Sequence, residues 1–205
     1  EGIRARLLRH AGELGRLAPP IVLSRAGFLL LLLADTAMVG HFDATELAYL
    51  SLGAGLIMPM TVTGLGLIMG TLVLAANNYG AGRFTVCGAV WRRSLIYAAA
   101  IGVLFALITI GGERIMLWTG QMPHLAAGGG HVMLILGLGL PGHLLFLSSA
   151  YFLEGIGRPS AVMRVMIAAN ILNVGLNWLL IDGTMIEGVS GAAAAVAATS
   201  AVRWL

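Results

Sequence analysis

The 205-residue sequence is short of charged side chains, which make up only 10% of it. Soluble domains carry about 25% charged residues, and the polar side chains here are too few to cover a globule in water. Hydrophobic residues reach 59%, and the mean hydropathy is +0.92. This balance excludes the usual classes of soluble enzyme and predicts a protein whose surface faces lipid.

Two further shortages exclude other classes of function. The single cysteine, Cys87, excludes an intramolecular disulfide and any Cys-x-x-Cys metal or redox site. Lysine is absent, the 12 basic residues are all arginine, and the net charge is only +3, so no basic tract can bind nucleic acid. The sequence begins at Glu1 and ends at Leu205 inside an apolar run, so we expect it to be part of a longer protein, truncated at the C-terminus.

The sequence does contain long apolar runs. A helix crosses the hydrocarbon core with about 20 apolar residues, and charge, proline and glycine divide the chain into runs of roughly this length. We therefore predict an all-α integral membrane protein, a six-transmembrane-helix bundle after a basic amphipathic head at 1–18. The predicted spans within 19–205 are about 19–40, 47–76, 89–110, 131–153, 160–181 and 188–205. Pro59 predicts a kink in the second span, and the glycines at 128–130 predict a flexible turn.

The distribution of arginine predicts the orientation of the spans. Alternate loops are basic or mainly acidic. The basic set comprises the head, Arg83, Arg92, Arg93, Arg158 and Arg164, and the opposite set comprises Asp43, Glu46, Glu113, Arg114, Asp182 and Glu187. Arginine is enriched in cytoplasmic loops, so we expect the N-terminus to be cytoplasmic.

An acid inside the first span is the strongest functional candidate. Asp35 lies about five residues before the outer end of this span, roughly 8 Å deep at the helical rise. An ionisable group in hydrocarbon is costly unless it pairs or lines a wet cavity. One interpretation is a carboxylate that points outward to water at the interface. The other is an acid in a cavity that exchanges a proton near neutral pH or pairs with a cation.

Three asparagines in the fifth span strengthen the second interpretation. Asn170, Asn173 and Asn177 share one helical face because they are three and four residues apart. Asn177 lies at about the same depth as Asp35, since both spans run outward. Amides also join helices without any role in transport. A carboxylate beside an amide stripe nevertheless predicts a proton or cation site.

The remaining polar residues carry weaker signals. Glu154 is interpreted as a charge at the cytoplasmic interface beside Arg158. His131 and His143 lack a partner acid, so packing is favoured over metal ligation. We expect no metal site, and no nucleophile and base are paired as an enzyme would require.

Five stretches of the sequence resemble the amino-terminal lobe of the multidrug and toxic compound extrusion (MATE) family in their order and spacing. Asn at 177 followed by Trp resembles the NorM-like bacterial branch of that family. The stretches are DTAMVG at 35–40, NNYGAGR at 77–83, EGIGRPSAVM at 154–163, NILNVGLNWLLIDG at 170–183 and GVSGAAAA at 188–195.

The resemblance implies an antiporter of two six-helix lobes in the bacterial inner membrane, which exports cationic drugs in exchange for H⁺ or Na⁺ and needs no other cofactor. Its partners would be the bilayer, the drug and the carboxyl-terminal lobe of the same protein. The family's ion-coupling network maps to Asp35, Asn173 and Asn177. The alternatives are a lipid or polysaccharide flippase of the same superfamily and, from other classes, a membrane scaffold or enzyme.

One departure from the family pattern bears on the coupling ion. Some members place a threonine early in the sixth helix, where this chain has Ala195 and Val196, with Thr199 a turn later. We therefore expect the hydroxyl to be missing from the network, which argues against coupling to protons alone.

Overall fold

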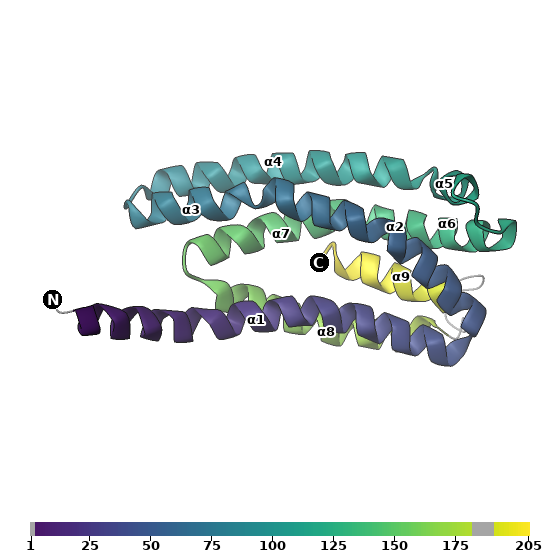
Figure 1. Ribbon diagram of the computed structural model, residues 1–205, viewed down its shortest axis with the longest axis horizontal. Coiled ribbons are helices and arrows are strands. Elements are labelled where there is room, and N and C mark those ends of the chain that lie inside the picture. The colour runs from purple at the N-terminus through teal and green to yellow at the C-terminus, as the bar shows by residue number, and fades with distance from the viewer. Residues whose placement is uncertain (1–2, 182–190) are drawn as a thin grey trace.

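The computed structural model of the protein describes residues 3–181 and 191–205, and its side chains outside 3–14 and 16. Within these ranges the chain is helical and no strand occurs (Figure 1). The helices are α1 (Ile3–Phe42), α2 (Ala44–Ile68), α3 (Gly70–Gly80), α4 (Phe84–Thr109), α5 (Gly112–Trp118), α6 (Pro123–Leu138), α7 (Leu140–Gly155), α8 (Pro159–Leu180) and α9 (Gly191–Val202).

The long helices run roughly along the longest axis of the molecule (Figure 1). The helix α1 packs chiefly on α8, α2 on α6, and α4 on α7. The short helix α9 lies among them and contacts α6, α8, α1 and α2. This arrangement brings α1, α8 and α9 together around one point, although α1 is far from α8 and α9 in the sequence.

Four helical segments are long and apolar enough to cross a membrane, and α6 with α7 forms a fifth candidate as a pair bent by 43°. The four segments are Leu17–Phe42, Ala44–Gly80, Phe84–Thr109 and Pro159–Leu180. The structure is therefore the all-α membrane bundle that the composition predicts. The predicted sixth span, 188–205, lies partly outside the described residues, and its described part is the shorter apolar helix α9. Asp182 and Glu187 also lie outside the described residues. From Ile3 onward the backbone of the predicted head is described, and it continues into the first span as one helix, α1.

The helix α2 continues through Pro59, the residue at which a kink is predicted, and ends at a break at Met69. One local prediction differs from the structure. The glycines at 128–130 lie inside α6 rather than in a turn, because their missing side chains allow close packing: a Cβ on Gly130 would lie 2.7 Å from the backbone nitrogen of Glu113. The single cysteine, Cys87, is buried near the start of α4.

The start of α9 is held by an acid from α2. The backbone nitrogen of Ala192 donates to Glu46 Oε2 at 2.9 Å, and that of Gly191 donates to the carbonyl oxygen of Ile181 at 2.9 Å. Gly191 has a φ of 55°, a left-handed conformation that favours glycine. A carboxylate is favourable at a helix N-terminus, where backbone donors have no helical partner. These contacts fix the position of α9 relative to α2 and α8.

The connection between α1 and α2 is capped by Asp43. Its Oδ1 accepts from the backbone nitrogens of Thr45 at 2.6 Å and Glu46 at 3.0 Å, and these bonds hold the pKa of Asp43 below its ordinary value. We predict that Asp43→Ala lowers the thermal stability of the detergent-solubilised protein at neutral pH. The loss should shrink as the pH falls below about 4, because Asp43 of the unfolded chain then binds a proton that the capped carboxylate of the folded protein takes up only at lower pH.

The matched control is Asp43→Asn, which keeps a capping oxygen and should lose less stability at neutral pH. The measurement is the melting temperature of the wild type, Asp43→Ala and Asp43→Asn across pH. An equal loss for Asp43→Ala at pH 7 and at about pH 3 would contradict the capping role.

Candidate functional site

Asp35 is buried, with 4% of its surface exposed, although its side chain is ionisable. It is one of the few acids in the chain. It lies on α1 and turns inward toward α8 and α9. The interpretation of Asp35 as an interfacial carboxylate that points outward to water is therefore wrong. A buried carboxylate requires compensating donors, and the structure supplies them from two other helices.

Three side chains donate to the Asp35 carboxylate. Asn177 Nδ2 lies 2.7 Å from Oδ1, Asn173 Nδ2 lies 3.3 Å from Oδ1, and Thr199 Oγ1 lies 2.5 Å from Oδ2. Asn173 Nδ2 also donates to Thr199 Oγ1 at 2.8 Å. We call these four residues the Asp35 cluster. All four side chains are buried, and together they join α1, α8 and α9.

One atom of the cluster has no partner among the described residues. Asn177 Oδ1 is buried and accepts no hydrogen bond. An unpaired buried acceptor is costly, and here it belongs to the amide that donates to Asp35. The cluster thus offers a carboxylate and a free amide oxygen in one place. Such oxygens suit a hard cation or a proton-bearing group.

The three predicted asparagines do not all join this cluster. The structure brings Asn173 and Asn177 to Asp35 but not Asn170. The amide of Asn170 donates to the carbonyl oxygens of Gly27, at 3.0 Å, and Met166, at 2.8 Å. Asn170 therefore links α8 to the backbone of α1 at Gly27, outside the cluster.

Thr199 is the member of the cluster that the sequence analysis missed. The hydroxyl expected to be absent from the network is present, because Thr199 and not Ala195 faces Asp35. Residues 195 and 199 are four apart and share one face of a helix. That spacing was the available signal, but the sequence does not show how far α9 is shifted along its axis relative to α1.

The cluster borders a cavity of about 800 Å³ between the helices. Its lining is mainly apolar. The ionisable or hydroxyl-bearing residues on its wall include Asp35, Thr61, His143, Thr199 and Arg203. Trp204 and Leu205 also lie on the wall, so residues that follow Leu205 in a longer chain would leave from the cavity. In the described part of the chain, no group of three or more His, Cys, Asp and Glu residues could hold a metal ion.

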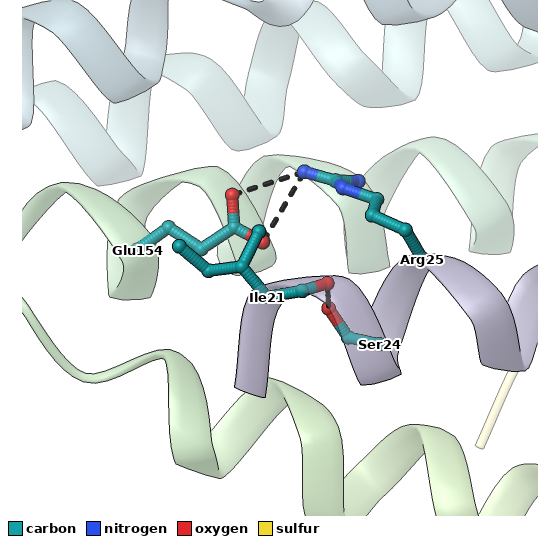
Figure 2. A network of polar contacts seen from close by, with 4 residues as sticks. All are labelled: Ile21, Ser24, Arg25 and Glu154. Atoms are coloured by element: carbon teal, nitrogen blue, oxygen red, sulfur yellow. Dashed lines mark hydrogen bonds and ion pairs between the residues drawn. The ribbon is translucent and has the colours of Figure 1, made fainter. Parts of the chain in front are cut away.

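Glu154 pairs with a different arginine from the neighbouring Arg158. Its carboxylate lies against Arg25 of α1, with Arg25 Nη2 at 2.9 and 3.2 Å from the two oxygens (Figure 2). The two residues are 129 positions apart in the sequence, and no local pattern reveals such a pair.

The structure is a helical membrane bundle with a buried polar cluster beside an apolar cavity. Residues 20–179 match the sequence model of the MatE family. This match covers well over half of the chain, and the chain belongs to that family. The resemblance seen in the sequence motifs is thereby confirmed.

Curated relatives agree with this assignment. The chain is 34% identical to a probable multidrug resistance protein NorM of Caulobacter vibrioides, over 93% of the chain and 41% of the relative. It is 28% identical to the multidrug resistance protein MdtK of Pectobacterium atrosepticum, over 97% of the chain and 44% of the relative. The chain thus spans about two fifths of the length of these relatives.

Solved structures show the same fold. The eukaryotic MATE transporter AtDTX14 superposes with a TM-score of 0.86 at 17% identity, over 96% of this chain and 43% of that one. A MOP superfamily transporter from Pyrococcus furiosus superposes with a TM-score of 0.83 at 21% identity, over 93% and 42%. The chain therefore corresponds to one lobe of such a transporter.

We predict that Thr199→Val destabilises the protein by about 1–3 kcal/mol, because a buried carboxylate oxygen loses its donor while the side-chain volume is kept. Thr199→Ser restores a hydroxyl and should recover most of the loss. The measurement is thermal unfolding of the full-length protein in detergent.

The matched control for this substitution is Thr61→Val. Thr61 lines the same cavity, but its hydroxyl donates only to the carbonyl oxygen of Ile57 in its own helix, at 3.0 Å. Thr61→Val should therefore cost much less. Equal losses at the two positions would argue against a special role for the bond between Thr199 and Asp35.

Proposed function

We propose that this chain is the amino-terminal lobe of a bacterial multidrug efflux antiporter, in which H⁺ or Na⁺ at the Asp35 cluster is exchanged for a cationic drug. The observation that carries the proposal is the buried carboxylate held by donors from two further helices beside an unpaired amide oxygen. The names of the relatives, multidrug resistance proteins NorM and MdtK, support it.

The geometry suggests how binding at the cluster acts on the helices. Asp35 lies on α1 and its donors lie on α8 and α9, so its charge holds three helices together. A proton converts one carboxylate oxygen from acceptor to donor, and a cation takes up the same lone pairs. Either event changes the bonds between helices. An ion that favours one helix arrangement and a drug that favours another displace each other across the cycle.

The same proposal covers the second lobe, the membrane and the orientation of the chain in it. The carboxyl-terminal lobe of the same protein would supply the other wall of the drug path. The arginines at 83, 92, 93, 158 and 164 support a cytoplasmic N-terminus in the bacterial inner membrane. We infer transport and not catalysis, because the relatives are named as multidrug resistance proteins and a solved structure of this fold is named as a transporter.

A flippase of the same superfamily is less well supported. We expect a flippase cavity to carry several arginines that face anionic headgroups. Among the described residues, Arg203 alone brings a guanidinium to the wall of the large cavity.

We predict that Asp35→Asn in the full-length protein lowers drug efflux by about tenfold or more, because the neutral amide keeps the size of the side chain but cannot exchange a proton or pair with a cation. The assay is dye efflux from proteoliposomes under an imposed H⁺ or Na⁺ gradient. Comparison of the two gradients also identifies the coupling ion.

The control variant is Asp43→Asn, which neutralises an exposed acid at the start of α2 that lies outside the cluster. It should transport at close to the wild-type rate. Wild-type efflux by Asp35→Asn under both gradients would remove Asp35 from the mechanism.

A further inference from the structure

A second, smaller cavity lies between α1 and α7. Its volume is about 260 Å³. We call it the α1–α7 crevice, and it is lined by Ser24, Arg25 and Phe28 of α1 and by His143, Phe146 and Ala150 of α7, among others. Phe28, His143 and Phe146 also line the large cavity that contains Asp35. The crevice is therefore adjacent to the large cavity and shares a wall with it.

Two side-chain contacts close this crevice. At its partly exposed end, Arg25 pairs with Glu154 at 2.9 Å (Figure 2). Arg25 also lies over the ring of Tyr151, 5.2 Å from the ring centroid. At its inner end, the rings of Phe28 and His143 meet with their centroids 5.2 Å apart. Arg25 is partly exposed at the crevice, whereas Phe28 and His143 line both the crevice and the large cavity. The helices themselves pack mainly elsewhere, α1 on α8 and α7 on α4.

We propose that the α1–α7 crevice is a side entrance to the Asp35 cavity, and that the Arg25 and Glu154 pair, backed by Phe28 and His143, is the gate that closes it. The inference rests on the proposed function only in assuming that an ion or drug must reach Asp35. None of the four gate residues belongs to the Asp35 cluster, and α1 packs chiefly on α8 rather than on α7.

The chemistry of the outer contact suits a closure that opens reversibly. Glu154 is nearly buried, with its side chain 5% exposed, whereas that of Arg25 is 44% exposed. A pair of this kind stabilises the closed state, because removal of the arginine leaves a buried carboxylate without its partner. When the crevice opens, water solvates both charges. An apolar plug of the same size would gain no such solvation on opening.

The test measures whether water reaches the crevice. In full-length protein without native cysteines, Cys87→Ser included, a single cysteine replaces Ala150, which is buried in the crevice wall. The protein is held in nanodiscs, where a water-soluble maleimide reaches both sides. Labelling should be slow with the pair intact. It should be about tenfold faster in Arg25→Gln or Glu154→Gln, which corresponds to about 1.4 kcal/mol.

The matched control is a cysteine at Ser148, on the opposite face of the same helix. Ser148 is buried and its hydroxyl lies 2.7 Å from that of Ser94 on α4. Its labelling should stay slow in every variant. The exchanged pair, Arg25→Glu with Glu154→Arg, should return the cysteine at 150 to slow labelling.

Two outcomes would overturn the proposal. If both cysteines label faster in Arg25→Gln, the pair stabilises the whole bundle and is not a gate. If neither does, the pair is a static clamp. Because labelling needs no drug or ion gradient, these outcomes are independent of whether Asp35 drives efflux. A loss of efflux in Asp35→Asn with unchanged labelling at position 150 would separate the two proposals.

Discussion

The bundle depends on one constraint: a carboxylate that lies inside an apolar structure must receive hydrogen bonds from protein groups. Asp35 receives them from Asn173, Asn177 and Thr199. Because the donors lie on α8 and α9, the need to satisfy one side chain determines how three helices meet. Packing of apolar residues alone discriminates weakly between helix arrangements in lipid, since the tails of lipids are as apolar as the side chains. The Asp35 cluster supplies the specificity that packing lacks.

Small residues make this meeting of helices possible. The helix α9 is built largely of alanine, with the sequence GAAAAVAATSAV, so it can lie among four neighbours. The glycines of α6 serve the same purpose against α5 and α2, where Gly128 faces Tyr49 and Gly129 faces Met116. Glycine, which often marks turns in soluble proteins, here allows close contact between helices.

The sequence predicted the parts of the site that local rules govern. Helical periodicity placed Asn173 and Asn177 on one face, and the cost of a charge in lipid made Asp35 conspicuous. The parts that it missed depend on contacts between distant segments. Thr199 reaches Asp35 only because Glu46 and Ile181 fix the start of α9. The arginine partner of Glu154 lies on another helix, and the glycine run could signal either a turn or close packing.

The bond from Asn170 to the backbone of Gly27 gives α1 a second attachment to α8. It lies eight residues before Asp35, or about 12 Å along the helix. A Cβ at Gly27 would clash with Met166 Cγ, so a larger residue there would have to displace the side chain of Met166. Two attachment points fix both the rotation and the axial position of α1 on α8. If an ion alters the bonds at Asp35, the other point remains as a fulcrum, and a small change at one end of α1 becomes a tilt of the whole helix.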